Sequence, residues 1–118
     1  MDHKLHKYVA DILMGIDAIE QYLGNKKIFE TYQNNSLLQD AIERNLITIG
    51  EAMNNILKLD PNIAISNSRK IVDTRNKLTH GYDDISNVQI WNILINHLPT
   101  LKIECIQLLP PNTENPTT

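Results

Sequence analysis

Apolar residues recur at intervals of three and four along most of the chain, which is the spacing of amphipathic α-helices. The first apolar stripe predicts a helix over residues 4–23 that ends at Gly24. The polar stretch over residues 24–35 predicts a loop, with a short helical turn around residues 28–29. No stretch of any length alternates apolar and polar residues as a half-buried strand would. The pattern therefore predicts an all-α protein.

A second apolar stripe begins after Ser36, a good helix-capping residue, and stops before the Asp-Pro pair at residues 60–61. Leu37 and Ile47 lie off this stripe, so the helix is apolar on more than one side, which favours contact with a partner subunit. Gly50 lies inside the helix, where glycine costs about 1 kcal/mol relative to alanine. We therefore expect another helix to approach closely at Gly50.

The remaining apolar positions predict a shorter helix capped by Ser68 and a last helix capped by Ser86 or the residue after it. Pro99 should kink the last helix or divide it in two, because proline lacks a backbone donor and clashes one turn back. We expect residues 1–109 to form one antiparallel four-helix-type bundle. Residues 110–118 contain no packing residues, so we expect them to be a disordered tail.

The composition fits a single small domain. The chain has 118 residues, of which 42% are hydrophobic, and this is enough for an adequate core. Its apolar runs are far too short for a membrane helix and no apolar signal region precedes the first helix, so we expect a cytoplasmic protein. Cys105 is the single cysteine, which supports neither an internal disulfide nor a zinc site, and its apolar neighbours predict burial.

The formal net charge of −3 argues against a protein that coats nucleic acid through a global positive field. The sign of the charge reverses between residues 69 and 80, where the sequence has four basic residues and one acidic residue, Asp73. Those four are Arg69, Lys70, Arg75 and Lys77. The sequence therefore allows a local basic cleft in an acidic protein.

Arg75 and His80 are the candidate chemical groups of this basic stretch. On a continuous helix they would point about 140° apart, because each residue turns the chain by about 100°. They converge only if the helix ends between them, or if partner subunits bring copies of them together. Gly81 favours a helix end near residues 79–80.

Histidine is the natural proton-transfer group near neutral pH, and arginine is a permanently charged clamp for phosphate. Together they suit RNA cleavage, which needs proton transfer at the 2′-hydroxyl or the 5′-oxygen and a cation beside the phosphorane. No carboxylate cluster or His/Cys spacing indicates a metal site, so metal-free cleavage fits better than a two-metal nuclease. By itself the spacing favours a plainer interpretation, in which Arg75 and His80 are capping and surface groups and Tyr82 only packs.

Residues 75–82, Arg-Asn-Lys-Leu-Thr-His-Gly-Tyr, resemble the signature of HepT-like proteins of the HEPN superfamily, in which four residues separate arginine from histidine and one separates histidine from tyrosine. Residues 36–46 and 49–52 resemble the second helix of that family, and parts of residues 91–99 fit its last helix. The resemblance extends over nearly the whole chain up to about Leu109.

The resemblance implies an all-helical homodimer in which a short extra helix carries the motif and two Arg/His sets share one cleft. It implies a metal-independent endoribonuclease without a cofactor, the toxin of a type VII toxin–antitoxin pair, that cuts messenger or transfer RNA and leaves 2′,3′-cyclic phosphate ends. The implied partner is a minimal (MNT-type) nucleotidyltransferase that moves AMP from ATP onto the motif tyrosine. An anionic nucleotide at that point would fill the cleft and repel RNA phosphate.

The resemblance also assigns roles residue by residue. Arg75 would bind the scissile phosphate and stabilise the transition state, and His80 would be the general acid or base. Asn76 would orient His80 or the RNA, and Lys77 would contact the RNA backbone. Tyr82 would accept the regulatory AMP.

Two other interpretations stay open, and one departure from the family pattern slightly favours the first of them. Asp73 and Thr74 stand where we expect small or apolar residues, and an acid two residues from Arg75 could pair with it and weaken phosphate binding. The chain could then be a non-catalytic HEPN partner of a nucleotidyltransferase. It could also be a dimeric helical protein whose motif only stabilises a helix end.

Overall fold

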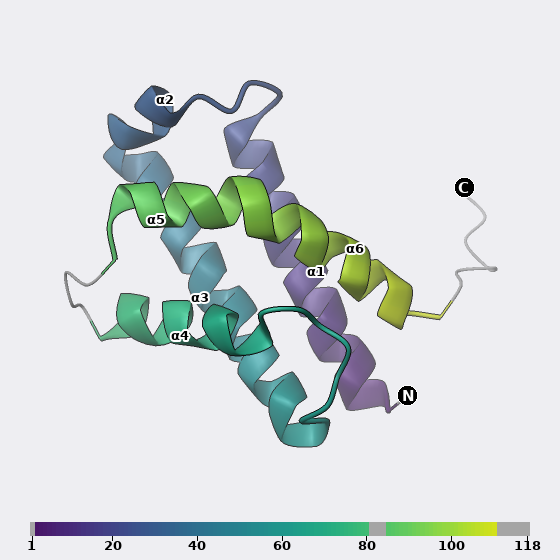
Figure 1. The fold of residues 1–118 in the computed structure, drawn as a ribbon. Coiled ribbons are helices and arrows are strands. Elements are labelled where there is room, and N and C mark those ends of the chain that lie inside the picture. Colours follow the sequence, from purple (N-terminus) through teal and green to yellow (C-terminus); the bar gives the residue numbers. More distant parts are fainter. Residues whose placement is uncertain (1, 81–84, 111–118) are drawn as a thin grey trace.

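The protein is built from helices alone in the part of the chain that the structure, a computed structural model, describes: residues 2–80 and 85–110. Figure 1 shows α1 and α3 lying side by side, with α4 and the continuous α5–η1–α6 segment crossing in front of them. This arrangement confirms the expected all-α bundle. The elements are α1 (His3–Leu23), α2 (Phe29–Gln33), α3 (Ser36–Leu59), α4 (Ser68–Thr79), α5 (Asn87–Asn92), η1 (Ile93–His97) and α6 (Leu98–Leu108).

The two long helices form the centre of the core, because each buries the apolar stripe that its sequence predicts. α1 begins one residue earlier than expected, where the side chain of Asp2 accepts a hydrogen bond from the backbone of Lys4 at 2.8 Å. It ends at Gly24, whose φ of 69° is left-handed and therefore suits glycine. The buried residues of the two helices are Leu5, Val9, Ile12, Gly15, Ile16 and Ile19 of α1 and Ile42, Leu46, Ile49, Gly50, Ala52, Met53, Ile56 and Leu57 of α3.

Two expected caps are wrong by one residue. α3 is capped by Asn35 rather than Ser36, because the Asn35 side-chain oxygen accepts the backbone N–H of Leu38 at 3.0 Å. α4 is preceded by Asn67 rather than capped by Ser68. Asn67 has a left-handed backbone, with φ of 60°, a conformation that asparagine tolerates better than most residues do.

The short helix α2 covers one end of the bundle. Its Tyr32 is fully buried and packs on Trp91, with ring centroids 5.7 Å apart, and Phe29 packs edge-on against the same ring at 5.8 Å. The expected helical turn near residues 28–29 is therefore present, and it is anchored by aromatic contacts.

The last helical segment begins as expected and contains a wide turn. Ser86 and Gln89 form a capping box at the start of α5. η1 is a π-helical turn directly before Pro99, which lies in the first turn of α6. Because Pro99 has no N–H and its ring crowds the preceding turn, the α-helical bonding pattern is interrupted where the sequence predicts a break.

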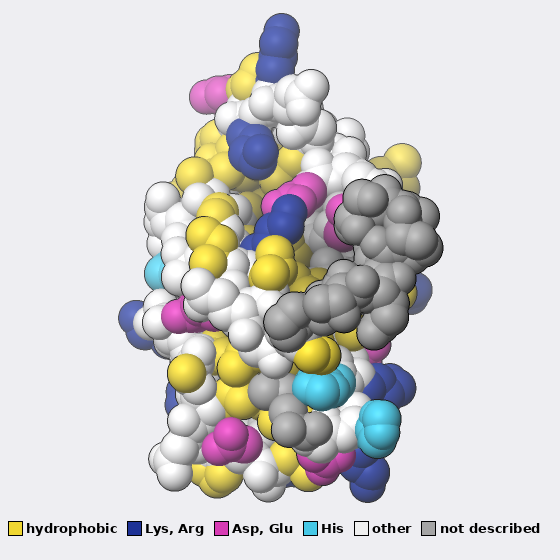
Figure 2. Space-filling model, turned by 90° about the vertical axis from the view of Figure 1, so that its right-hand side faces the viewer, with side chains coloured by type: hydrophobic (Ala, Val, Ile, Leu, Met, Phe, Trp, Pro, Cys, Tyr) yellow, Lys and Arg dark blue, Asp and Glu magenta, His cyan; other side chains and the backbone are white. Residues whose placement is uncertain are grey.

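Cys105 of α6 is fully buried, as its apolar neighbours predict. On the face shown in Figure 2, charged side chains of both signs are interspersed among apolar ones. In the described ranges, no helix combines the length and apolar character that a membrane crossing requires. The expected tail at residues 110–118 lies outside the described residues except for Pro110.

Candidate functional site along α4

α4 carries a positive charge that the rest of the chain does not share. Its twelve residues hold two arginines and two lysines against one aspartate, whereas the whole chain has a formal net charge of −3. The helix packs extensively against α3 alone, as far as the described residues go. Another flank faces α5, η1 and α6 across an open cavity, whose lining also includes Leu46 and Ile49 of α3. α4 therefore has one closed flank and one open flank.

The closed flank is fitted around Gly50 of α3. A Cβ atom at Gly50 would overlap the Cβ of Arg75, and it would lie 2.9 Å from the Arg75 Cγ and 3.2 Å from the Ile71 carbonyl oxygen. Only a residue without a side chain leaves room for this approach. The close approach of a helix that we expected at Gly50 is therefore confirmed, and the approaching residue is Arg75.

The aliphatic stem of Arg75 packs against Gly50, and part of its guanidinium lacks a hydrogen bond within the described structure. Its side chain is half-buried, and no group among the described residues accepts a hydrogen bond from its buried Nε. A buried polar atom of this kind costs about 1–3 kcal/mol in folding. Asp73 makes no ion pair with Arg75, and it lies exposed on the helix. Residues two apart leave a helix in nearly opposite directions, so the expected pairing with Asp73 is absent.

His80 ends α4, as the following glycine predicts. Its backbone N–H donates to the Asn76 carbonyl oxygen at 3.1 Å, and the Thr79 hydroxyl donates to the same oxygen at 3.2 Å. The His80 side chain is exposed. α4 stays helical through Thr79, so Arg75 and His80 of one chain leave the helix about 140° apart. The described helix therefore does not bring Arg75 and His80 of one chain together.

A cavity of about 450 Å³ lies along the open flank. Of the predicted site residues that the structure describes, Lys77 alone lies in its lining, because Arg75, Asn76 and His80 lie elsewhere on the helix and its end. Tyr82, the expected acceptor of AMP, lies outside the described residues. The lining comprises Leu46, Ile49, Asn67, Lys70, Ile71, Asp73, Thr74, Lys77, Ile85, Val88, Gln89, Asn92, Ile93, His97 and Leu98.

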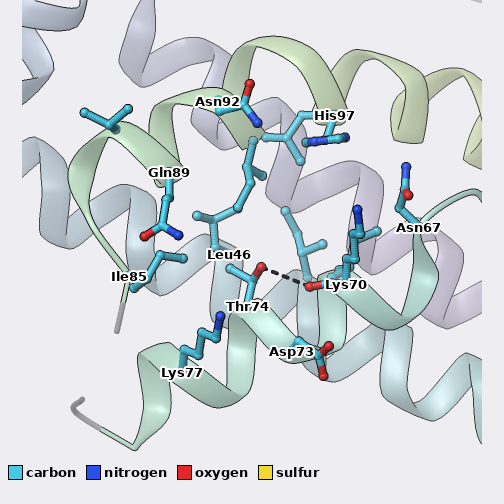
Figure 3. Close-up of a pocket in the computed structure, with 15 residues that line it drawn as sticks. Leu46, Asn67, Lys70, Asp73, Thr74, Lys77, Ile85, Gln89, Asn92 and His97 are labelled. Carbon is cyan, nitrogen blue, oxygen red and sulfur yellow. Dashed lines mark hydrogen bonds between the residues drawn. The ribbon is translucent and has the colours of Figure 1, made fainter. Parts of the chain in front are cut away.

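Figure 3 shows how polar groups are distributed around this cavity. Lys70 rises from α4 at the end where Asn67 and His97 lie, and Lys77 lies at the other end, where Ile85 and Gln89 lie. The Thr74 hydroxyl between them donates to the Lys70 carbonyl at 3.0 Å. The signal for the α4 wall was present in the sequence, because residues 70, 74 and 77 follow helical spacing. Nothing in the sequence pattern pointed to His97.

Cys105, Tyr32 and Glu43 have shifted pKa values, but none of them belongs to α4. Burial, with a smaller contribution from Glu104, raises the pKa of Cys105 to about 12, so its thiol stays protonated near neutral pH. Burial raises the pKa of Tyr32, whose hydroxyl has no hydrogen-bond partner, and the charge of Glu43 adds to the shift. Burial also raises the pKa of Glu43, and Asp40 adds to it. None of these groups faces the cavity.

The described residues bring together no group of three or more histidine, cysteine, aspartate or glutamate side chains of the kind that holds a metal ion. The polar groups that α4 and its C-terminal end carry include a guanidinium, lysine ammonium groups, an amide and an imidazole. These groups bind anions and transfer protons.

The sequence matches one described family over most of its length. The family model for ribonuclease HepT-like proteins matches residues 12–108. A protein from Thermococcus cleftensis, named probable ribonuclease HepT, is 32% identical over 102 residues, which cover 82% of this chain and 89% of that protein. No solved structure gives a significant match.

Proposed function

Because the chain belongs to the HepT-like ribonuclease family, we propose that it is a metal-independent endoribonuclease whose reaction depends on Arg75 and His80. The observation that carries this proposal is the placement of Arg75. Its stem lies flat on Gly50, and its guanidinium includes a buried Nε that no protein group satisfies. An anionic ligand on the guanidinium would repay part of the cost of burying it, as RNA phosphate can.

The proposed reaction is transfer of the RNA phosphate from the 5′-oxygen to the neighbouring 2′-oxygen. A neutral imidazole of His80 takes the proton of the 2′-hydroxyl, and the 2′-oxygen forms a bond to phosphorus. The bond to the 5′-oxygen breaks, and that oxygen leaves with a proton. Arg75 neutralises the extra charge on the phosphorane between these steps. The products are a 2′,3′-cyclic phosphate and a 5′-hydroxyl.

A homodimer completes this site in the proposal. Two copies of His80 allow one imidazole to accept a proton while the other donates one, and they remove the need for Arg75 and His80 of one helix to converge. The side chain of Leu37 on α3 is 81% exposed, which fits the expectation that this helix has a second apolar side for a partner.

Regulation in the proposal follows the toxin–antitoxin pattern that the resemblance implies. A nucleotidyltransferase antitoxin of the MNT type would transfer AMP to the Tyr82 hydroxyl, and pyrophosphate would leave from ATP. The added phosphate places a negative charge two residues from His80, and this charge repels the RNA backbone. Mass spectrometry of the intact chain after co-expression should show one added AMP, and Tyr82→Phe should prevent it.

Cleavage of RNA in the presence of EDTA tests the catalytic proposal. We expect wild-type protein to release products with 2′,3′-cyclic phosphate ends, and His80→Ala to slow cleavage by about 10²–10⁴-fold, the usual contribution of general acid–base catalysis. Lys26→Gln, an exposed substitution in the loop before α2, serves as a control that should cleave normally. Cleavage that EDTA abolishes, or full activity of His80→Ala, would contradict the proposal.

The non-catalytic alternative has lost the observation that favoured it. It rested on an acid able to neutralise Arg75, and Asp73 makes no such contact. A tight complex with the nucleotidyltransferase that survives substitution of both Arg75 and His80, together with no RNA cleavage, would restore it.

A further inference from the structure

The cavity on the open flank of α4 is built differently from the seam that holds Arg75. Its floor and walls include aliphatic side chains from several elements, among them Leu46 of α3, Ile71 of α4 and Ile93 of η1. Polar side chains stand around this apolar interior. A cavity of about 450 Å³ with an apolar lining and a few directed polar groups has the size and character of a small-ligand site.

The charge of the cavity selects an anionic occupant. Lys70 and Lys77 both line it from α4, and no ion pair occupies either ammonium group in the described structure. Among the residues that the structure describes, Asp73 is the single carboxylate of the lining. The two lysines are seven residues apart, which is about 10 Å along the helix axis, so their long side chains can reach phosphates on either side of one bound nucleotide.

The opposite wall offers groups that read a base. Gln89 and Asn92 lie one helical turn apart on α5, and His97 follows on η1. The oxygen of Gln89 already accepts from the Ser86 backbone N–H at 2.7 Å, and that of Asn92 accepts from the Asn96 side chain at 2.6 Å. Their amide N–H groups are therefore what they can offer to acceptor atoms on the edge of a nucleobase. The aliphatic side chains of the lining can pack against the face of the base. Single-stranded RNA is commonly recognised in this way, by bases turned out of the stack and bonded along their edges.

We propose that this cavity binds one nucleotide of a single-stranded RNA, with Lys70 and Lys77 on the flanking phosphates and the base between α4 and α5. The inference rests on the proposed function, because it takes RNA to be the ligand and gives it a path along the helix that carries Arg75. It adds a binding site separate from the groups that cut: Lys70, Gln89, Asn92 and His97 hold the strand and do not transfer the proton.

A second copy of this chain is the competing occupant, and the charges disfavour it. In a symmetric contact the same patch appears on both subunits, so Lys70 and Lys77 would approach their own copies. Lysine is also depleted in the cores of protein interfaces. A polyanion gains from both lysines, whereas the described lining of a second copy brings two lysines and only one aspartate, Asp73, to the contact.

The test is RNA binding by fluorescence anisotropy, with a short labelled single-stranded oligoribonucleotide and His80→Ala as the background so that the probe is not cut. In this background we expect Lys70→Gln with Lys77→Gln to weaken binding by at least about tenfold at low salt. The dependence of log K on log salt should become shallower by about 1.4, since each phosphate contact on a single strand contributes about 0.7. The matched control is Lys26→Gln with Lys27→Gln, which removes the same charge from exposed sites outside the lining.

A second variant fills the cavity without changing charge. Val88 lines the cavity and is 64% exposed, so Val88→Trp adds bulk there without disturbing the core. We expect a comparable loss of RNA affinity with an unchanged salt dependence. Ile106→Trp on α6, at a position that is 53% exposed and outside the lining, is its control and should bind as the background does.

The outcomes separate this inference from the proposed function. If the lysine pair and Val88→Trp bind RNA as their controls do, the inference is wrong even when wild-type protein cleaves RNA. If Val88→Trp shifts the monomer–dimer equilibrium in sedimentation and leaves RNA affinity intact, the cavity is a subunit interface and the inference is again wrong. If wild-type protein cuts no RNA but the cavity variants weaken binding as expected, the proposed catalysis fails and the nucleotide site stands.

Discussion

The two flanks of α4 differ in how tightly they pack: one positions a side chain closely, and the other is open to solvent. On the flank against α3, the backbone of Gly50 and the stem of Arg75 touch so closely that no additional atom fits between them. On the flank facing α5, an open cavity separates the helix from its neighbours. A close fit fixes where the arginine stem lies, and an open flank leaves lysines free to meet a ligand. Close packing therefore holds the stem of Arg75 on one flank, while the exposed lysines lie on the other.

The sharpest test of the closed flank is Arg75→Met, which keeps the stem and removes the guanidinium. We expect RNA cleavage to fall by about 10²–10³-fold, the usual effect of removing one preorganised group that stabilises transition-state charge. The free energy of unfolding should stay within about 1 kcal/mol, because the contact with Gly50 remains and a buried unsatisfied Nε disappears. Cleavage assays and urea unfolding measure the two effects. Unfolding of this variant would show that the guanidinium is structural.

The next test moves the arginine without replacing it. In Gly50→Ala the new methyl group overlaps Arg75, so α4 must shift away from α3. A displacement of about 1 Å at a catalytic group can lower the rate about 10²-fold. Overpacking costs about 1–3 kcal/mol, which the better helix propensity of alanine offsets by about 1 kcal/mol. We expect a large loss of cleavage with a small loss of stability.

Gly15→Ala is the matched control for that experiment. A Cβ at Gly15 would lie 2.8 Å from Cγ1 of Ile49, in the seam between α1 and α3 and away from Arg75. Its cost in stability should resemble that of Gly50→Ala, while cleavage stays near the wild-type rate. Equal loss of cleavage in both variants would mean that Gly50 acts through overall stability and not through the position of Arg75.

The smallest effect is expected on the open flank, from Thr74→Ala. Thr74 lines the cavity, and its hydroxyl bonds only to the carbonyl one turn back in its own helix. Substitutions away from packed contacts usually change stability by less than about 0.5 kcal/mol. Thermal and urea unfolding should therefore barely distinguish this variant from the wild type. A drop of several kcal/mol would show that the flank is packed in solution and that the contrast between the flanks is false.

The closed flank could largely be predicted from the sequence, and the open flank could not. Apolar periodicity placed α1 and α3 to within a residue, and an otherwise costly glycine inside α3 indicated a close neighbour. The two caps were missed by one residue because asparagine and serine adjoin at both places, and local backbone geometry decides between them. The sequence singled out Arg75 and His80 as candidate chemical groups. Apolar periodicity does not predict the direction in which either side chain points relative to the rest of the fold.

The cavity could not be predicted from the sequence for a different reason. It depends on a space between α4 and the α5–α6 segment, and no pattern within one helix reports how far the next one stands from it. Lys70 and Lys77 were visible as a local excess of charge, but their partners across the cavity were not. His97 in particular comes from η1, where the ordinary helical spacing no longer predicts which residues share a face.

The wide turn η1 has a consequence for how this chain can vary by insertion and deletion. Ile90, Leu94 and Leu98 are all buried although they stand four apart, a spacing that drifts by about 40° per step on a regular α-helix. A π-helical turn absorbs that drift by holding one residue more than an α-helical turn does. Loss of one residue between Asn92 and Leu98 would thus remove the extra residue of the wide turn and leave the inward faces of α5 and α6 in phase. Elsewhere in α6, the same deletion would turn every later side chain by about 100° and carry Cys105 out of the core. A gap of a single residue, when the chain is aligned with its relatives, is structurally cheapest at this one turn of the final helix.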